Sequence, residues 1–320
     1  MKQSAIRLAV LSALGLIPVH AMADWVNLPA VGSSPSTAYV TCNPTGNFGS
    51  GDSTPPSTLT DACAIFPATR NSSPESGYTL YASQIGRNVN LSNSYTSSST
   101  ITVATMDEAV WKNSGTGTLE SCIYGNRFTM IDVDYWKGAG HTGKQTLEIN
   151  GFARAGFASF TNVAAAYFYS SVSDESVFRV GRTYTSVQHR ASLANEDNPA
   201  TGYVALPPTS GATSGAAISG VATYDNPLLT PTTAQQSAAF AANWVEFTSD
   251  NNFADEDGSS LKDSSQLYVK VTGTGACPNL SGGGLTAGAY SFRQTGQEEA
   301  PLFEFNMSGY IPSAGSVTIP

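Results

Sequence analysis

The chain is poor in basic residues, and this shortage restricts the partners it can bind. Its 320 residues include 15 lysines and arginines against 24 aspartates and glutamates, for a net charge of −9. Nucleic acids and anionic membrane surfaces are bound through clusters of lysine and arginine. The acidic composition therefore argues against both as partners, whereas it suits solubility and the binding of divalent cations.

Long apolar runs are absent beyond the N-terminus. The basic residues Lys2 and Arg7 precede an apolar stretch from Leu8 to Val19. Ala21-Met22-Ala23 then places small residues at the positions that a signal peptidase recognises. This is the three-part pattern of a secretory signal, and the stretch is shorter than the roughly 20 residues of a membrane helix. We expect residues 1–23 to be a signal peptide and the mature chain to be periplasmic, on the cell surface or extracellular, with no transmembrane segment.

Motifs of the common enzyme classes are missing as well. The sequence contains no phosphate-binding glycine loop, dinucleotide fingerprint, haem-attachment motif, GxSxG elbow or HExxH zinc helix. Histidine is scarce, so a Ser-His-Asp triad in the mature chain would have to use His141 or His189. The sequence therefore presents no evident catalytic site.

Cysteine is scarce too, but its number is even. An exported chain with Cys42, Cys63, Cys122 and Cys277 is expected to form two disulfides. Three pairings are open, and we favour Cys42 with Cys63 and Cys122 with Cys277. The alternative, a four-cysteine metal site, is disfavoured because the sequence has no CxxC pair.

The remaining patterns predict a mostly β fold. Residues 24–76 are rich in Pro, Gly, Ser and Thr, and we expect a loop-rich segment pinned by the first disulfide. Residues 77–320 alternate short apolar runs with turn signals, which predicts a β-rich main domain. We expect an antiparallel β-sandwich or a partly closed barrel with long polar loops. One short helix is predicted at about residues 231–243, where a proline follows a threonine cap.

Two hairpins are predicted from turn residues between these strands. The first joins residues 122–135 to residues 146–160 through the glycine-rich stretch 137–144. The second turns at Thr295-Gly296-Gln297, just before the last strand. Each hairpin predicts that the two flanking strands are neighbours in one sheet.

Two sets of residues are candidate metal ligands. His141 and His189 each lie at the end of a predicted strand, and together they would hold copper, zinc or iron if those strands are neighbours. Asp255 and Asp257 match the middle of a calcium-binding EF-hand loop but not its first and last ligand positions. The alternatives are unrelated surface histidines and a solvated acidic turn. Calcium and copper are thus the cofactors that the sequence suggests.

Carboxylates and tryptophans suggest chemistry with sugars. Asp132 and Asp134 are predicted on one strand face about 6.5–7 Å apart, within the separation that glycoside hydrolases use. Two solvated aspartates would give the same pattern. Trp136 and Trp244 are candidate glycan-stacking residues, with a place in the core as the alternative for each.

The sequence therefore predicts, first, a secreted or surface-exposed structural or interaction protein such as an adhesin, matrix or filament subunit. It would form homopolymers by adding residues 24–35 or 317–319 as strands to a neighbour's sheet edge, or bind a surface glycan or protein. Ordinary frayed chain ends are the alternative interpretation of these two segments, and the favoured one. The alternatives are an exported metal-binding or glycan-binding module and a carboxylate-based glycoside hydrolase.

Overall fold

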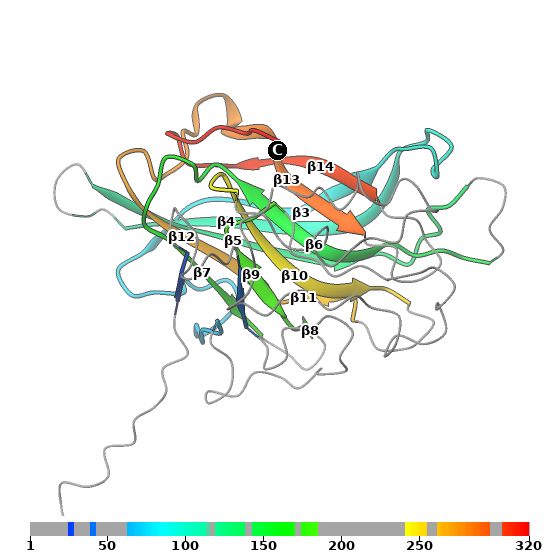
Figure 1. The fold of residues 1–320 in the computed structure, drawn as a ribbon, viewed down its shortest axis with the longest axis horizontal. Coiled ribbons are helices and arrows are strands. Elements are labelled where there is room, and N and C mark those ends of the chain that lie inside the picture. Colours follow the sequence, from blue (N-terminus) through cyan, green and yellow to red (C-terminus); the bar gives the residue numbers. More distant parts are fainter. Residues whose placement is uncertain are drawn as a thin grey trace, which may run out of the picture.

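Two β-sheets make up the fold (Figure 1). The coordinates are a computed structural model, which describes residues 25–28, 39–42, 63–113, 115, 119–137, 143–169, 174–184, 241–254, 261–294 and 303–319. Within these ranges the only helical element is a 3-10 turn at Ser281–Gly283, and no helix is long and apolar enough to cross a membrane. The mostly β class is confirmed. The expected signal peptide and nearly all of the predicted helix at 231–243 lie outside the described residues.

The first sheet is strongly curled, like half of a barrel. In it, β12 and β11 follow one another along one edge of β5, and β4 with β3 lies along the other edge. Beyond β12 the sheet continues through β7 to β1, and beyond β11 it continues to β8. Its strands are β1 (Val26–Asn27), β3 (Thr79–Leu91), β4 (Ile101–Asn113), β5 (Glu120–Met130), β7 (Val163–Phe168), β8 (Asp174–Glu175), β11 (Asp263–Ser264) and β12 (Gln266–Gly273).

The second sheet is antiparallel throughout, in the order β14-β13-β6-β10-β9-β2. Its strands are β2 (Tyr39–Thr41), β6 (Glu148–Ala155), β9 (Arg179–Gly181), β10 (Trp244–Asn252), β13 (Leu285–Gln294) and β14 (Phe303–Tyr310). The hairpin predicted before the last strand is confirmed by the pairing of β13 with β14.

The hairpin predicted through residues 137–144 is wrong. β5 and β6, the strands on either side of it, belong to different sheets. Both edges of β5 are already occupied, by β4 on one side and by β11 and β12 on the other, so no edge is left for β6. The strand also ends at Met130 rather than at residue 135, and the chain then crosses from the first sheet to the second.

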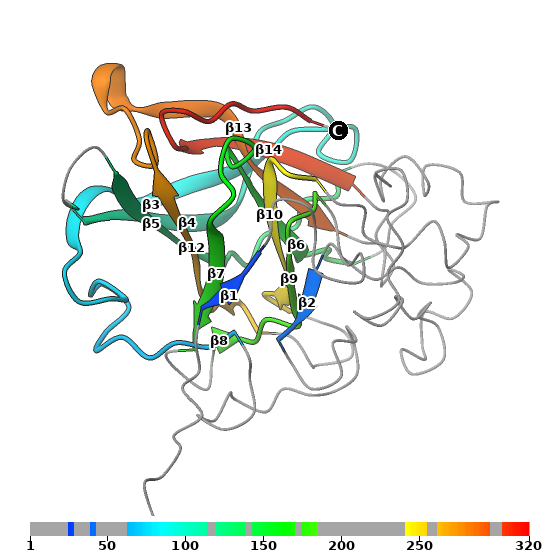
Figure 2. The same ribbon diagram turned by 60° about the vertical axis from the view of Figure 1, so that its left-hand side comes forward.

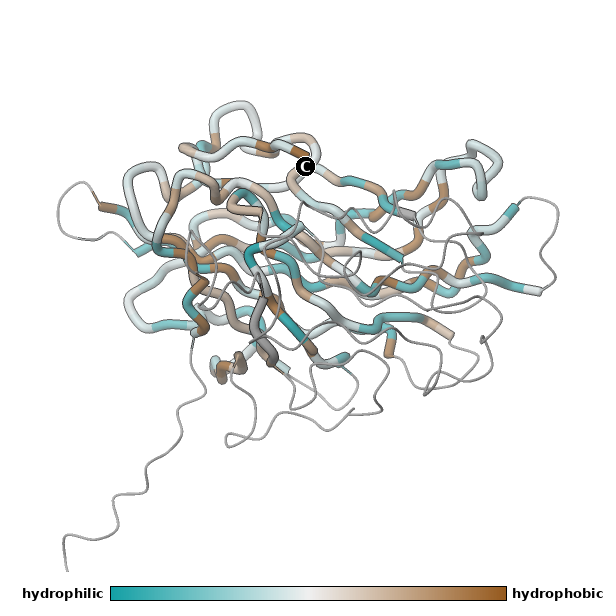
Figure 3. Tube along the Cα trace, in the orientation of Figure 1, coloured by the Kyte–Doolittle hydropathy of each residue, from teal (hydrophilic) through white to brown (hydrophobic). Residues whose placement is uncertain are grey.

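Aromatic rings from both sheets meet in the core between them. The ring centroid of Phe128 in β5 lies 5.8 Å from that of Phe152 in β6 and 5.9 Å from that of Phe292 in β13. All three side chains are buried. Successive residues of a strand point to opposite faces, and Figure 3 shows hydrophobic positions interspersed with hydrophilic ones along the strands.

A buried ion pair crosses this core. Arg154 of β6 donates to Glu108 of β4 at 3.0 Å, and the two side chains are 1% and 0% exposed. Glu108 also accepts hydrogen bonds from the backbone N–H of Tyr310 at 2.9 Å and from the Tyr290 hydroxyl. Arg154 also donates to the Asn126 side-chain oxygen and to the Tyr310 carbonyl. Because each charge has several partners, its burial is compensated.

Both predicted disulfides are present, and each lies at a junction between the sheets. Cys42 follows β2 at the edge of the second sheet, and its partner Cys63 accepts a backbone hydrogen bond from β7 in the first sheet. Figure 2 shows β2 beside β9 and β1 beside β7 on this side of the molecule. Cys122 in β5 is bonded to Cys277, in the connection from β12 to β13. Two disulfides are consistent with an oxidising extracellular or periplasmic compartment.

We expect Glu108→Ala to lower the free energy of unfolding by about 3–5 kcal/mol, because Arg154 would keep a buried charge without its carboxylate. Urea unfolding measures this. The control is Asp132→Ala, which removes an ion pair with Lys144 whose side chains are 47% and 49% exposed, and which should change stability by no more than about 1 kcal/mol. Equal effects of the two substitutions would contradict the structural role of the buried pair.

The two disulfides should differ in their contribution to stability. They join residues that are 21 and 155 positions apart. In the chain-entropy model the longer loop is worth about 5 kcal/mol and the shorter one about 3 kcal/mol. Urea unfolding of the double variants Cys122→Ala/Cys277→Ala and Cys42→Ala/Cys63→Ala tests this order, which the opposite ranking would refute.

Candidate functional site

The metal ligands proposed from the sequence lie outside the described residues. This applies to His141, His189, Asp255 and Asp257. Within the part of the chain that the structure describes, no group of three or more His, Cys, Asp or Glu side chains is arranged to hold a metal ion. The calcium and copper sites therefore stay predictions.

The two candidate glycan-stacking tryptophans occupy different environments. Trp244 is fully buried, its ring centroid lies 4.6 Å from that of Tyr184, and its indole N–H donates to the Thr318 carbonyl. Its ring therefore has no open face. Trp136 is only partly buried and packs against Tyr95 with 5.0 Å between ring centroids. Of the two, Trp136 alone retains ring surface that a sugar can reach.

The two aspartates considered for glycoside hydrolysis do not lie on a strand face. The segment that carries Asp132 and Asp134 is irregular, because β5 ends before it. Asp132 forms an ion pair with Lys144, and Asp134 pairs with Lys137 at 3.4 Å and accepts two backbone hydrogen bonds from its own loop. These contacts give both carboxylates a role in stabilising the loop.

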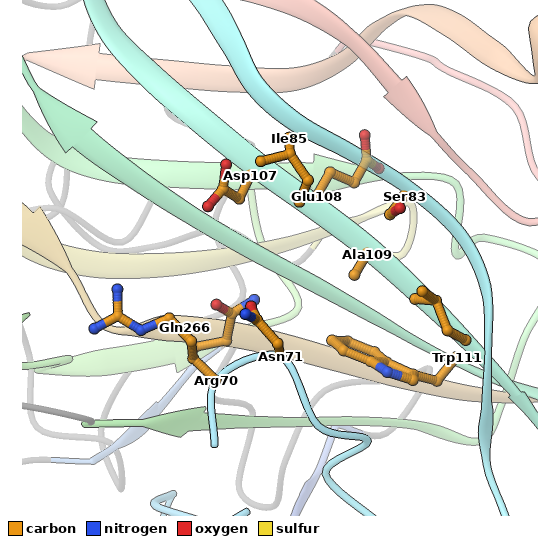
Figure 4. A pocket seen from close by; sticks show the side chains of 10 residues that line it. Arg70, Asn71, Ser83, Ile85, Asp107, Glu108, Ala109, Trp111 and Gln266 are labelled. Atoms are coloured by element: carbon orange, nitrogen blue, oxygen red, sulfur yellow. The ribbon is translucent and has the colours of Figure 1, made fainter.

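A groove of about 320 Å³ lies on the outer face of the curled sheet (Figure 4). Its volume is at the lower end of the roughly 300–1,000 Å³ range of small-molecule sites. The base is formed by β4, which contributes Asp107, Ala109 and Trp111. Residues of β3, of the loop before β3 and of β12 complete the walls: Leu80, Ser83, Ile85, Arg70, Asn71 and Gln266.

The groove exists because two very small residues face each other on neighbouring strands. Ala109 of β4 lies directly opposite Gly125 of β5. A Cβ atom at Gly125 would lie 2.7 Å from Trp111 Cζ3 and 3.0 Å from Gln266 Nε2, so only glycine lets these side chains approach the strand. The bulkier Trp111 and Gln266 then stand beside a gap that Ala109 does not fill.

Among the polar side chains of the groove that have no protein partner in the described part of the chain, Gln266 is the least exposed. Gln266 is 6% exposed, and its side-chain amide makes no hydrogen bond to another described residue. Figure 4 shows this amide and that of Asn71 pointing into the same part of the groove. The amide of Gln266 is not among the fully buried side-chain groups that lack a partner, so it keeps some surface toward the groove. It is therefore available to water or to a ligand.

The outer face becomes strongly polar next to the groove. Asp107 accepts a hydrogen bond from the Gly86 N–H at 2.8 Å, and Arg127 is its cross-strand neighbour. Arg127 forms ion pairs with Asp174 at 3.3 Å and Asp263 at 3.2 Å. These ion pairs fix the short strands β8 and β11 against β5.

The strand β8 also carries a buried carboxyl group, that of Glu175, next to Asp174 in the sequence. Glu175 is 3% exposed, and its Oε1 accepts a hydrogen bond from the Ser176 N–H at 3.0 Å, whereas its Oε2 has no hydrogen-bond partner among the described residues. Burial raises the pKa of Glu175 to about 8. The carboxyl is therefore mostly protonated at neutral pH in the folded chain.

Comparison with known proteins identifies no family. The chain matches no protein-family model, no curated protein and no solved structure. The candidate site therefore rests on the residues of this chain alone.

Sequence reasoning missed the groove. The available signal was the alternation of Asp107, Ala109 and Trp111, together with a glycine inside a strand pattern at Gly125. It became interpretable only once the register showed that Ala109 and Gly125 are neighbours.

Glu175→Gln should flatten the pH dependence of stability. The folded-state pKa of about 8 exceeds the unfolded value of about 4.3. The carboxyl's contribution is therefore fully present below pH ~4 and is lost as pH rises through ~8. Between pH 5 and pH 9, we expect the free energy of unfolding of the wild type to fall by about 2–5 kcal/mol more than that of Glu175→Gln. Urea unfolding at each pH measures this difference.

The matched control for this experiment is Asp174→Asn. It removes an ion-pair partner of Arg127 and should destabilise the chain at both ends of that pH range. Parallel pH profiles for the wild type and Glu175→Gln would refute the assignment of the titration to Glu175.

Proposed function

We propose that this chain is a secreted or surface-exposed interaction protein that binds its partner through the groove over β4. A β-rich chain with two disulfides suggests an extracellular protein. The observation that carries the proposal is the side-chain amide of Gln266, a residue only 6% exposed, which faces the groove without a partner among the described residues. Concave sites with a few convergent polar groups are the usual form of a binding site.

The edge of β3 supports binding in the groove rather than by strand addition. Among the described strands, β3 pairs only with β4, so it is a long edge strand. Its register shifts at three places, and its Gly86 N–H is already bonded to the Asp107 side chain. Bulges and occupied donors interrupt the hydrogen-bond ladder that an added strand would need.

The segments predicted to exchange between copies make contacts within their own chain. Val26–Asn27 forms β1 and pairs with β7. Near the other end of the chain, the Thr318 carbonyl accepts the indole N–H of Trp244. Strand exchange would first have to break these contacts.

Exposed apolar side chains border the groove and enlarge the surface available to a partner. Leu80 is 59% exposed and Ile85 is 69% exposed, and both line the groove from β3. Isolated exposed apolar residues are ordinary, but a group of them beside a concave site marks a contact surface. Ala109 and Trp111 of the groove lie on β4, a central strand that holds these side chains more rigidly than a loop would.

We expect Ala109→Leu to fill the groove and to weaken binding of the labelled mature chain to its target surface at least tenfold. The measurement is saturable binding to cells and to surfaces coated with matrix proteins or glycans. The control is Thr105→Leu, because Thr105 is also partly buried and lies on the same face of β4 but does not line the groove. It should bind like the wild type.

Circular dichroism and urea unfolding verify that both variants are folded. The proposal fails if the wild type shows no saturable binding to any surface. It also fails if Ala109→Leu binds as well as Thr105→Leu.

A further inference from the structure

We infer that the ligand of the groove is an uncharged saccharide. This inference rests on the proposed binding function and adds the chemical class of the partner. It is carried by the charge balance of the groove, by its unpartnered amide, and by an apolar surface beside that amide.

The charge of the groove favours neither anions nor cations. Arg70 and Asp107 contribute one charge of each sign to its lining. The third charged residue that lines the groove is Glu108. Its carboxylate is buried and forms ion pairs with Arg154 at 3.0 Å and with Arg87 at 3.3 Å. A phosphate or a sulfated ligand would need an excess of Arg or Lys, and the groove has none among its described residues.

The polar groups of the groove match hydroxyl groups. Gln266 and Asn71 carry side-chain amides, each with two N–H donors and one carbonyl acceptor, and Ser83 adds a hydroxyl. A sugar hydroxyl also donates and accepts, so adjacent hydroxyls can satisfy both ends of an amide. The Gln266 amide, which belongs to a residue only 6% exposed and has no partner among the described residues, is the group whose hydrogen bonds a ligand would complete.

The apolar part of the groove matches the C–H face of a sugar ring. Ala109, Leu80 and Trp111 contribute the apolar surface of the groove. Trp111 packs against Tyr268 with 6.0 Å between ring centroids, and its ring lies over Gly125. The tryptophan is therefore fixed before any ligand arrives, which lowers the entropic cost of binding. A pyranose, with hydroxyls at its rim and C–H groups on its face, fits both parts of the groove.

An extended peptide fits these observations less well. Peptides bind beside sheets mainly by extending the hydrogen-bond ladder, and the shifted register of β3 interrupts that ladder. Two side-chain amides without an adjacent regular edge give a peptide backbone little to align with. Preferential binding of a peptide would therefore overturn the inference.

The test is binding of the disulfide-bonded mature chain to an array of neutral oligosaccharides built from glucose, galactose, mannose and N-acetylglucosamine. Sialylated and sulfated glycans and a set of unstructured peptides share the array. We expect at least one neutral glycan to bind and the charged analogues to bind no better. Calorimetry with the best neutral glycan then gives its Kd.

Two variants assign that binding to the groove. Gln266→Met keeps the side-chain volume and removes the amide, and Ala109→Leu occupies the gap; each should raise the Kd at least tenfold. Thr105→Leu should leave it unchanged. Near-UV circular dichroism and the urea midpoint show whether each variant keeps its fold. If Gln266→Met does not fold, Ala109→Leu alone provides the test.

The outcomes separate this inference from the proposed function. If Ala109→Leu abolishes binding to the target surface but no neutral glycan binds, the saccharide inference is overturned and the groove remains a binding site for another partner. Preferential binding of peptides or charged glycans also overturns it. If a neutral glycan binds to Ala109→Leu and to Gln266→Met as tightly as to the wild type, its site lies elsewhere and the inference is wrong.

Discussion

The ion pair between Glu108 and Arg154 is the interaction on which the rest of the structure depends. It joins β4 of the first sheet to β6 of the second in the middle of the core, and the guanidinium lies 4.4 Å from the ring centroid of Tyr124 and 5.0 Å from that of Tyr290. Because side chains alternate along a strand, burying Glu108 places Asp107 and Ala109 on the opposite face. A shift of one residue would bury the groove and expose the carboxylate. The same contact therefore holds the sheets together and sets the face on which the groove is built.

The two sides of the sandwich are closed by different chemistry. On one side, the disulfide between Cys42 and Cys63 ties the edge of the second sheet to that of the first. On the other side, the edge strands β3 and β14 meet through hydrogen bonds, as Arg87 donates to the Ser308 carbonyl at 2.8 Å. A covalent bond suits the first junction because β2 has only three residues and offers few backbone hydrogen bonds. The longer strands at the second junction can rely on side chains.

Local patterns predicted the strands well, whereas contacts between distant segments could not be derived from them. Short apolar runs between turn signals predicted a β-rich domain over residues 77–320, and the even cysteine count with export predicted both disulfides. The hairpin through 137–144 failed because turn residues show where a chain bends and not which sheet the next strand joins. Glu108 and Arg154 look like ordinary surface charges in the sequence. Their burial, like the meeting of Ala109 with Gly125, follows from pairing between segments far apart in the chain.

The chain departs from two local rules at one place, beside the groove. Gly125 stands inside a central strand, where glycine costs roughly 0.5–1 kcal/mol relative to alanine. Gln266 is 6% exposed, and its side-chain amide has no hydrogen-bond partner among the described residues, which is uncommon for a residue so little exposed. The Cβ position of Gly125 lies 3.0 Å from Gln266 Nε2, so the two departures share a location. Sequences that are otherwise consistent with their fold break such rules mainly at functional sites, and here both departures maintain one groove. A side chain added at Gly125 would displace Trp111 and Gln266, and with them the surface that a ligand contacts.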